Sequence, residues 1–509
     1  MKHARLELAL VIVALGLLST TATALVNHFG WTLYYGDAEA HLNIARRILD
    51  SRTPGYDQIG TVWLPLPHLL PMALVRDDRL WRSGLAGAIP ASVCFVVAGG
   101  FLFAAMRLAT ESSAAALASL GLLALNPNLL YLQATPMTEP VFLAAMMALL
   151  YCAIRFHAKQ SWSAVIGAAV ASSAASLTRY EGWFLIPFCT LYFVFAARRR
   201  RILVALLFGA IASLAPLFWL AHNWWLYSNP LEFFNGPFSA QSIYRRQLEQ
   251  HMPPYPGDHD WWKALQYFSV AARLCEGWGV VAVAAAGLLA MVAVRKAIWW
   301  PLLFASLPPI FYLWSMHSGG TPIFVPSLWP NTYYNTRYGL AALPLLAIAG
   351  GCVALLGSPK IRLCMAIAAV LAGAAPWLVH PRPDDWACWE ESLRNSTARR
   401  AWTKRAASVL AVQYEAGSEI FTSFGDLIGI LREAGIPIRE ALHDGNVPEW
   451  MSAVRRPDLF LHARWAVAMS GDIVATTIQR ATLKTGPHFR LVQVITVRNA
   501  PVIEIYHQE

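Results

Sequence analysis

Charged residues are scarce in this chain, and their scarcity excludes an ordinary soluble protein. Only 14% of the 509 residues are charged, 57% are hydrophobic, and the mean hydropathy is +0.43, whereas a soluble domain has about 25% charged residues. The composition therefore predicts an integral membrane protein. The formal net charge of +10 does not indicate a nucleic-acid partner, because the position of basic residues in such a protein reflects its membrane topology.

The sequence also lacks the patterns of several cofactor sites. It contains no glycine-rich phosphate loop after a strand, no internal repeat and no low-complexity tract, so nucleotide binding is not expected. The seven cysteines show no metal-ligand spacing. Cys275 and Cys388 fall near the outer side of the membrane as assigned below, where a single disulfide is conceivable, but spacing alone cannot show one. The other five lie in apolar segments: Cys94, Cys152, Cys189, Cys352 and Cys364.

Long apolar runs fill most of the chain. A helix needs roughly 17–25 mostly apolar residues to cross a bilayer, and about 11 segments approach this pattern. We therefore expect a polytopic α-helical membrane domain over residues 1–380. The predicted spans are 7–27, 83–106, 112–133, 138–157, 162–178, 182–197, 202–222, 274–294, 297–316, 338–356 and 361–379.

The first of these spans has a second interpretation. Lys2 and Arg5 precede an apolar core that ends in an Ala-Thr-Ala triplet at 22–24, which is typical of a cleaved signal peptide. The core also continues to Val26, which makes it long enough for a retained span. Both interpretations leave the following residues on the outer side of the membrane.

Basic residues mark one side of the predicted spans. With a cytoplasmic N-terminus, every short cytoplasmic connection carries Lys or Arg, as the positive-inside rule requires. The connections 28–82, 223–273 and 317–337 and the tail from 380 then lie on the outer side. The basic residues on the cytoplasmic side are Arg107, Arg155, Lys159, Arg198, Arg199, Arg200, Arg201, Arg295, Lys296, Lys360 and Arg362.

Residues 381–509 have the composition of a soluble domain. They are richer in charge and have no long apolar run, which predicts a C-terminal α/β domain on the outer side. We expect a helix over 385–414 and a strand over 419–424. Asp426 then begins a helix that ends at Gly435. Further strands are expected at 458–462 and 490–507.

Acidic residues close to the membrane gather on the outer side. Asp37 and Glu39 follow the first span in Asp37-Ala38-Glu39, and an amphipathic stretch containing His41 comes next. An ionised group beside hydrocarbon is costly to keep, so we interpret these residues as a site. The alternative is a pair of solvated loop charges.

Two further outer loops carry glutamates. Glu139 lies in Thr138-Glu139-Pro140, where it either contributes to a site or only offsets the dipole of the helix that follows. Arg179 and Glu181 lie in the next outer turn and either take part in binding or form a structural salt bridge with each other.

Arginine and tyrosine residues on the same side are candidates for binding an anion. Arg337 and Tyr338 enter the tenth span, and Tyr244 and Arg245 lie in the long outer loop. A guanidinium can hold a phosphate through two parallel hydrogen bonds. The alternative for Arg337 and Tyr338 is a membrane-interface anchor.

These motifs resemble those of the GT-C superfamily of integral membrane glycosyltransferases. The resemblance covers roughly residues 1–380 and is to the branch of bacterial aminoarabinose transferases and protein O-mannosyltransferases. It rests on the acidic Asp37-Ala38-Glu39, on Thr138-Glu139-Pro140, on the many spans, and on the outer domain that follows the last span. The mannosyltransferases have adjacent Asp and Glu, whereas Ala38 separates them here, so Asp37 is the surer correspondence.

The resemblance implies an inverting transfer of a monosaccharide at the periplasmic side of a bacterial inner membrane. The donor would be a polyprenyl-phosphate sugar, and the acceptor a lipid, a glycan or a protein of the cell envelope. Asp37 would take the proton of the acceptor hydroxyl, and Glu139 would stabilise positive charge on the sugar ring. Arg245 and Arg337 would bind the phosphate, while Glu39, His41, Arg179, Glu181, Tyr244 and Tyr338 complete the predicted substrate-binding set.

Two further expectations concern metals and an alternative function. No metal or other cofactor is expected, although carboxylates on facing loops are suited to a divalent cation. A transporter or flippase of a lipid-linked or polar substrate is the main alternative to a transferase. Such a protein usually places ionisable groups near the bilayer midplane, whereas the middles of these spans are almost free of charge.

Overall fold

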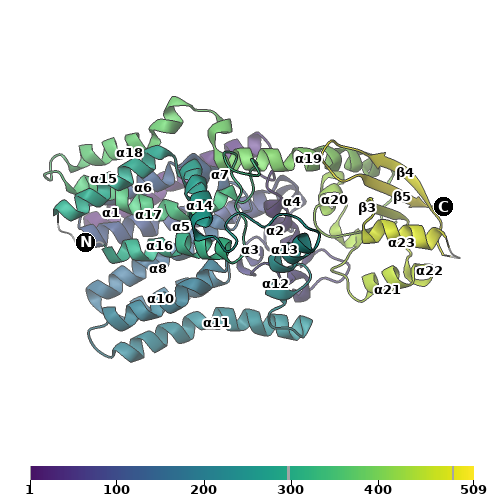
Figure 1. Cartoon of the computed structure of the whole chain (residues 1–509), viewed down its shortest axis with the longest axis horizontal. Coiled ribbons are helices and arrows are strands. Elements are labelled where there is room, and N and C mark those ends of the chain that lie inside the picture. Colours follow the sequence, from purple (N-terminus) through teal and green to yellow (C-terminus); the bar gives the residue numbers. More distant parts are fainter. Residues whose placement is uncertain (1, 295–298, 484–485) are drawn as a thin grey trace. The chain divides into compact units, whose positions relative to one another are not determined.

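The computed structural model describes residues 2–294, 299–483 and 486–509. The chain forms two compact units (Figure 1). The first, here called the helical unit, comprises Met1–Phe29, Thr61–Pro67 and Ala88–Glu391. The second, the sheet unit, comprises Gly30–Gly60, His68–Gly87 and Ser392–Glu509. The sheet unit thus combines the C-terminal tail with most of the first predicted outer loop.

The helical unit consists of long apolar helices joined by short connections. Its elements are α1 (Lys2–His28), α5 (Leu85–Thr110, from residue 88), α6 (Ser113–Ala124), α7 (Pro127–Leu132), α8 (Glu139–Lys159), α9 (Trp162–Ser176), α10 (Glu181–Ala196), α11 (Arg201–Tyr227), α12 (Glu232–Asn235), α13 (Ala240–Glu249), α14 (Trp261–Glu276), α15 (Trp278–Val294), α16 (Trp299–His317), η2 (Thr336–Ala342), α17 (Leu343–Gly351), η3 (Cys352–Leu355), α18 (Arg362–Val379) and η4 (Pro383–Asp385).

Six of these helical segments are long and apolar enough to cross a membrane, or seven if the bent pair α14 and α15 counts as one span. This finding confirms a polytopic helical membrane protein. Most of the predicted spans overlap a single helix, and two that do not are described below. The start of the span at 297–316, together with Arg295 and Lys296, lies outside the described residues. The total of about 11 crossings and the orientation of the termini stay predictions.

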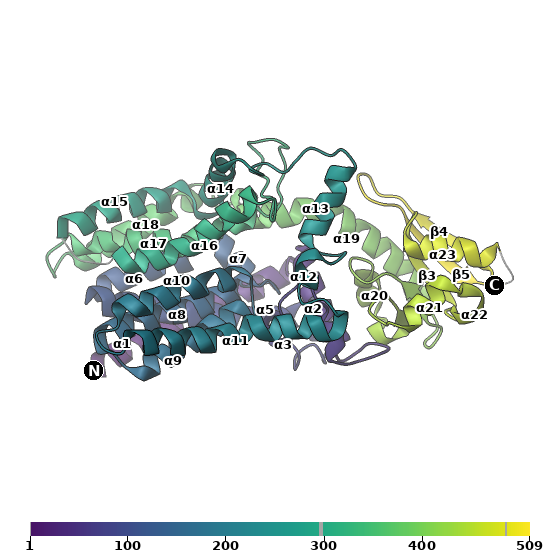
Figure 2. The same cartoon turned by 60° about the horizontal axis from the view of Figure 1, so that its bottom comes forward.

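The helices pack in two groups (Figure 2). In one group, α9 packs on α8 and α11, and α10 packs on α11. In the other, α17 packs between α6 and α15, and α18 contacts both α6 and α15. Helix α16 contacts members of both groups, α10 and α17. This arrangement brings the start of α8, the start of α10 and the segment η2 close to α16.

Two breaks in the apolar segments have local causes. The side chain of Asn126 accepts hydrogen bonds from the backbone N–H groups of Asn128 and Leu129, so it ends α6 and caps α7. Gly277, with a positive φ of 78°, separates α14 from α15, and the two helices meet at an angle of 103°. The predicted spans at 112–133 and 274–294 are therefore interrupted or shortened.

The described residues of the sheet unit form five strands in the order β2-β1-β3-β5-β4. Strand β1 pairs in parallel with β2 and β3, whereas β5 pairs antiparallel with β3 and β4. Helices α3 (Leu66–Leu69) and α19 (Ala387–Gln413) are shared with the helical unit. The other elements are α2 (Gly36–Arg47), η1 (Tyr56–Ile59), α4 (Asp78–Ser83), β1 (Ile420–Thr422), α20 (Ile428–Ala434), η5 (Ile438–Glu440), β2 (Ala441–Leu442), α21 (Glu449–Arg455), α22 (Pro457–Phe460), β3 (Trp465–Met469), α23 (Ile473–Thr482), β4 (Phe489–Ile495) and β5 (Ile503–Gln508).

Alternating side chains of the strands form two cores, one on each face of the sheet. Trp465 and Val467 of β3 pack with residues of α2, α19 and α20. Ala466 and Ala468 of the same strand pack with residues of α21 and α23 on the opposite face. This alternation is the period of two expected for a strand buried on both sides. The α2 segment of the first loop thus contributes to the core of an α/β unit.

One predicted strand is wrong. Residues 458–462 do not form a strand, because Pro457–Phe460 is the short helix α22, and the strand that follows is Trp465–Met469. Proline lacks an N–H group, so Pro457 suits the first turn of a helix better than a sheet. The predicted helix at 385–414 and the end of the next helix at Gly435 are confirmed, since Gly435 adopts the left-handed conformation after α20.

Candidate functional site

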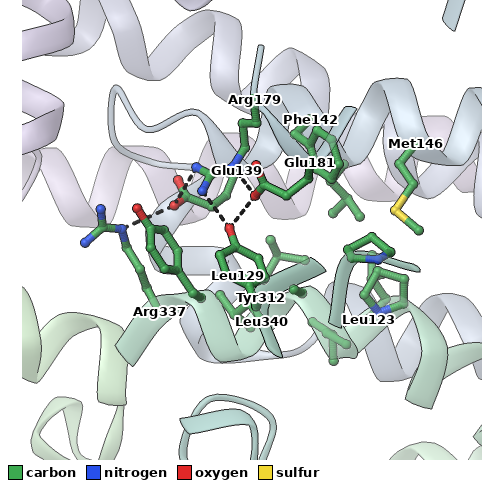
Figure 3. A pocket seen from close by; sticks show the side chains of 16 residues that line it. Leu123, Leu129, Glu139, Phe142, Met146, Arg179, Glu181, Tyr312, Arg337 and Leu340 are labelled. Carbon is green, nitrogen blue, oxygen red and sulfur yellow. Dashed lines mark hydrogen bonds and ion pairs between the residues drawn. The ribbon is translucent and has the colours of Figure 1, made fainter. Parts of the chain in front are cut away.

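A cavity inside the helical unit has a polar end and an apolar wall (Figure 3). Its volume of about 50 Å³ leaves room for several groups the size of a water molecule. The polar end contains two glutamates, two arginines and two tyrosines, which come from different elements. The lining residues are Leu123, Leu129, Glu139, Phe142, Leu143, Met146, Arg179, Glu181, Pro308, Tyr312, Arg337, Tyr338, Leu340, Ala341, Leu343 and Pro344.

Both glutamates of the cavity stand at the beginning of a helix. Glu139 is the first residue of α8 and Glu181 is the first residue of α10. A carboxylate at this position interacts favourably with the positive end of the helix dipole. Pro140 follows Glu139 in the first turn, where the missing N–H of proline costs no helical hydrogen bond. The local sequence therefore directs both carboxylates to the same end of their helices.

Arg179 connects three side chains at the polar end. Its Nε donates to Glu181 Oε1 at 2.7 Å, and its Nη1 lies 3.2 Å from Glu139 Oε1. Its Nη2 donates to the hydroxyl group of Tyr312 at 2.7 Å, and that hydroxyl donates to Glu181. The salt bridge between Arg179 and Glu181 is thus present, as one of the two sequence interpretations proposed.

Arg337 makes a second set of ion pairs with the same carboxylate. Its Nε lies 3.2 Å from Glu139 Oε1, and its Nη1 lies 3.4 Å from Glu391 Oε1. The backbone N–H of Arg337 donates to Glu391 Oε2 at 3.0 Å. The ring of Tyr338 lies near both guanidinium groups, 5.1 Å from Arg179 Cζ and 4.9 Å from Arg337 Cζ, within the range of cation–π attraction.

Three carboxylates, those of Glu139, Glu181 and Glu391, contact the guanidinium groups of Arg179 and Arg337. Both arginines contact the same oxygen of Glu139. Its second oxygen, Oε2, is buried and has no hydrogen-bond partner among the residues that the structure describes. A buried acceptor of this kind is costly unless a ligand, an ion or water satisfies it.

A different carboxylate cluster lies within the sheet unit. Glu39 is held between two arginines, with Oε1 2.9 Å from Arg432 Nη2 and Oε2 3.5 Å from Arg399 Nε. Arg432 also donates to the carbonyl oxygen of Arg82 at 2.7 Å. Arg399 donates to the carbonyl oxygens of Leu33 and Tyr34, at 3.2 and 2.9 Å. Glu39 therefore ties α2 to α19 and α20 inside this unit.

Two glycines make room for these ion pairs. A Cβ atom on Gly36 would lie 2.5 Å from Arg399 Nη1, and a Cβ atom on Gly429 would lie 2.4 Å from Glu39 Oε1. Both distances are far below van der Waals contact. The absence of side chains at Gly36 and Gly429 therefore lets Arg399 and Glu39 approach the backbone of their partners.

Asp37 lies two residues before Glu39 on α2 and is partly exposed. It shares its electrostatic environment with Asp426, whose carboxylate is 3.8 Å from Arg399 Nη1. Loss of hydration raises the pKa of Asp426, Arg399 opposes this shift, and the negative charges of Glu39 and Asp37 add to it. The sheet unit thus gathers three carboxylates beside two arginines, and Glu39 is the one that both arginines contact.

His41 belongs to a buried histidine pair in the sheet unit. Its Nδ1 lies 2.9 Å from Nε2 of His68, and both side chains are buried. Burial lowers the pKa of His68 well below its ordinary value, and the positive charges of His41 and Arg47 lower it further. A neutral His68 accepts a proton poorly, so this pair is suited to a fixed hydrogen bond. Substrate binding by His41 stays a prediction.

Tyr244 and Arg245 do not line the cavity. Tyr244 is buried and donates to Asp258 Oδ2 at 2.7 Å. Burial, followed by this hydrogen bond, raises the pKa of Tyr244 to about 12. Arg245 is the next residue of the amphipathic helix α13 and is exposed. A role for either residue in binding the donor stays a prediction.

The structure brings four predicted site residues together in the helical unit: Glu139, Arg179, Glu181 and Arg337, with Tyr338 beside them. It places Asp37, Glu39 and His41 in the sheet unit. Sequence reasoning missed Tyr312 and Glu391 of the first network and Arg399, Arg432 and Asp426 of the second. Tyr312 carries a hydroxyl group within an apolar run, and this polar group is the signal by which the sequence could have indicated a site residue. The others lie in a charged tail where such residues do not stand out.

Among the described residues, no group of three or more His, Cys, Asp or Glu side chains is arranged to hold a metal ion. The acidic clusters instead contain arginines, which neutralise carboxylates without a metal. The expectation that no metal or cofactor is needed stays a prediction.

Part of the chain matches a known family. Residues 80–225 match the family described as dolichyl-phosphate-mannose-protein mannosyltransferase, and this segment contains Glu139, Arg179 and Glu181. No curated protein sequence matches the chain significantly. The family match and the helical architecture confirm the predicted resemblance to the GT-C membrane glycosyltransferases.

The chain is also similar in fold to solved structures. The crystal structure of ArnT from Cupriavidus metallidurans bound to undecaprenyl phosphate superposes with a TM-score of 0.56 and 12% identity, over 96% of this chain and 97% of that chain. ArnT from the same organism in the apo state gives a TM-score of 0.52 and 13% identity, with the same coverage. At this identity the likeness establishes a shared fold.

Proposed function

We propose that the protein is an inverting glycosyltransferase that uses a polyprenyl-phosphate-linked monosaccharide at the periplasmic side of a bacterial inner membrane. The observation that supports this most is the correspondence of nearly the whole chain with ArnT, which was crystallised with undecaprenyl phosphate. The mannosyltransferase family match over 80–225 supports the same class of reaction. The acceptor is proposed to be a lipid, a glycan or a protein of the cell envelope.

Asp37 is proposed as the general base. A carboxylate that is partly exposed and surrounded by other negative groups is suited to take a proton from an acceptor hydroxyl. Glu39 is less suited to this role, because each of its oxygens faces an arginine. These different roles for Asp37 and Glu39 agree with the resemblance to the mannosyltransferase motif. Ala38 separates the two residues here, and Asp37 is the surer correspondence.

Glu139 is proposed to stabilise the positive charge that develops on the sugar ring. Glycosyl transfer passes through a state with oxocarbenium character, and a carboxylate fixed in advance stabilises such a charge without reorganising. The unpartnered Oε2 of Glu139 supports this role.

The donor phosphate needs a cation that is not already neutralised. Arg337 is paired with Glu139 and Glu391, so a phosphate would have to displace one of these carboxylates. Arg245 is exposed and meets no such competition from them. We therefore propose Arg245 as the first phosphate contact and keep Arg337 as a second candidate.

The proposal is tested with the full-length protein reconstituted in liposomes and supplied with polyprenyl-phosphate sugars of several kinds. Release of free polyprenyl phosphate in the presence of a membrane-lipid, glycan or protein acceptor supports it. Asp37→Asn is expected to lower this release about 10²- to 10⁴-fold. Asp57→Asn, which changes an exposed aspartate of the same unit, is the matched control. Equal release by the Asp37→Asn variant and the parent would exclude Asp37 as the base.

A further inference from the structure

Two buried thiols in the helical unit are not explained by glycosyl transfer. Cys275 lies at the end of α14, just before the bend at Gly277, and Cys388 is the second residue of α19. Both side chains are completely buried, and neither is in a disulfide in the structure. They are far apart in the sequence, so only the fold brings them together.

One asparagine side chain connects the backbones of the two cysteines. Asn128 Nδ2 donates to the carbonyl oxygen of Cys275 at 2.7 Å, and Asn128 Oδ1 accepts from the N–H of Cys388 at 2.8 Å. The side chain of Asn126 donates to the same carbonyl oxygen of Cys275 at 3.0 Å. Asn126 and Asn128 are buried, and buried hydrogen bonds of this kind are costly to break. The two backbones are therefore held in a fixed relation.

The two thiols are neighbours, since Cys275 is one of the groups that raise the pKa of the Cys388 thiol. The Sγ of Cys275 also donates to the carbonyl oxygen of Thr336, at 3.2 Å, but a thiol is a weak donor. A disulfide requires sulfur atoms about 2.05 Å apart. Because Asn128 already holds the backbones of the two cysteines together, we expect the bond to form by rotation of the two side chains, with these backbone hydrogen bonds kept.

We propose that Cys275 and Cys388 form a disulfide bond in the folded protein. The predicted topology, which is part of the proposed function, places both residues near the outer side of the membrane, where disulfides form and persist. The remaining five cysteines lie in helical segments that we expect to be in the membrane, so the pair Cys275–Cys388 is the one that meets an oxidising compartment.

The bond would form by exchange with a protein disulfide of that compartment. The thiolate of one cysteine attacks a sulfur of the oxidant, which gives a mixed disulfide and releases one thiol of the oxidant. The second cysteine, after losing its proton, attacks the mixed disulfide at the sulfur of the first. This step forms the Cys275–Cys388 bond and releases the oxidant as a dithiol.

The exchange is expected during folding, before α14 and α19 are packed. In the folded state burial raises the pKa of the Cys388 thiol, and the neighbouring Cys275 raises it further, so little thiolate is present. Complete burial also excludes a protein oxidant. Once formed, the disulfide is protected from reductants for the same reasons.

The bond would support the first residues of α19. Glu391 lies one helical turn after Cys388 and holds both the backbone and the guanidinium of Arg337. On the other side, Cys275 contacts the carbonyl of Thr336, the residue before Arg337. A covalent link between these segments would keep the Arg337 network in place during movements of the helices.

The test counts free thiols in the full-length protein. Cells are quenched in acid, the protein is denatured in detergent, and its thiols are labelled with a maleimide-polyethylene glycol, with and without prior reduction. The chain has seven cysteines, so the proposal predicts five conjugates without reduction and seven after it. Peptide mass spectrometry without reduction should identify the peptide of Cys275 joined to that of Cys388.

Single variants identify the pair. Cys275→Ser and Cys388→Ser are each expected to abolish the reductant-dependent gain of two conjugates. Cys364→Ser, which removes an exposed cysteine, should keep that gain. Seven conjugates from the unreduced parent protein would overturn the proposal, and so would a gain that survives in Cys275→Ser. The measurement on the parent protein stands even if a variant fails to fold, and its result is independent of any sugar transfer.

Discussion

Two glutamates of this molecule are each held between two arginines, and the two units use this arrangement differently. In the sheet unit each oxygen of Glu39 faces its own arginine, Arg432 or Arg399. In the helical unit both arginines face the same oxygen of Glu139, and the other oxygen is left without a partner. The first carboxylate is saturated, whereas the second can still accept a hydrogen bond or a positive charge.

The difference separates a structural role from a functional one. Arg399 and Arg432 also bind backbone carbonyls of the sheet unit, so Glu39 completes a clamp that fixes α2 and with it Asp37. The arginines of the helical unit each have a second carboxylate, Glu181 or Glu391. Glu139 is therefore not needed to neutralise them. A bound ligand better explains why a carboxylate with a buried, unpartnered oxygen lies here.

The largest effect is expected from removing an arginine of the helical network. Arg179→Met would leave Glu139 and Glu181 without their common partner in a site where the arginine side chain is only 12% exposed. Breaking a buried ion pair in this way costs about 3–5 kcal/mol. The thermal unfolding midpoint of the full-length protein in detergent micelles should fall strongly compared with Arg198→Met, which changes an exposed arginine. An unchanged midpoint would show that the network is solvated.

The comparison of the two glutamates is tested directly by neutral substitutions. Glu39→Gln should destabilise the protein by about 1.5–3 kcal/mol, the usual value of hydrogen bonds to charged groups, because two largely buried arginines lose the carboxylate that they share. Glu139→Gln should change stability by less than about 1 kcal/mol, since Glu181 and Glu391 remain.

The same pair of variants separates stability from transfer. Glu139→Gln should reduce the rate of sugar transfer on the order of 10²-fold, as expected when one group that stabilises transition-state charge is lost. Glu39→Gln should lower this rate less, once the rate is corrected for the amount of folded protein. Thermal unfolding and release of polyprenyl phosphate measure the two effects. If Glu139→Gln lost stability and kept its transfer rate, the distinction between the two glutamates would be wrong.

The sequence predicted the helical unit well because its signal is local. Apolar runs of sufficient length gave the helices, and the topology assigned from basic residues placed Glu139, Arg179, Glu181 and Arg337 on one side of the membrane. The structure brings these four residues together. Their pairing could not be predicted, because it depends on Tyr312 and Glu391, which join the network only through helix packing.

The sheet unit was harder to predict because its contacts are distant in sequence. The helix α19 and the strand β1 have clear local patterns, and both were predicted. The joining of α2 with α19 and α20 around Glu39 was not. A charged residue in a polar tail, such as Arg399 or Arg432, carries no local signal that distinguishes a partner of Glu39 from a solvated surface arginine. The strand predicted over 458–462 was wrong for a local reason, because Pro457 favours the start of a helix.

The smallest expected effect concerns Asp426, the third carboxylate of the sheet unit. Its pKa is raised, so the folded state binds its proton more tightly than the unfolded state. Its ionisation therefore destabilises the folded protein as pH rises through the raised pKa, and this penalty disappears when pH falls below the unfolded value near 4. Asp426→Asn should thus raise the unfolding midpoint at pH 7 relative to the parent, and the difference should vanish near pH 3.5. Because 54% of the side chain is exposed, we expect less than about 0.5 kcal/mol. A midpoint that falls at pH 7 would mean that the contact with Arg399 outweighs the repulsion by Glu39 and Asp37, and that Asp426 belongs to the clamp.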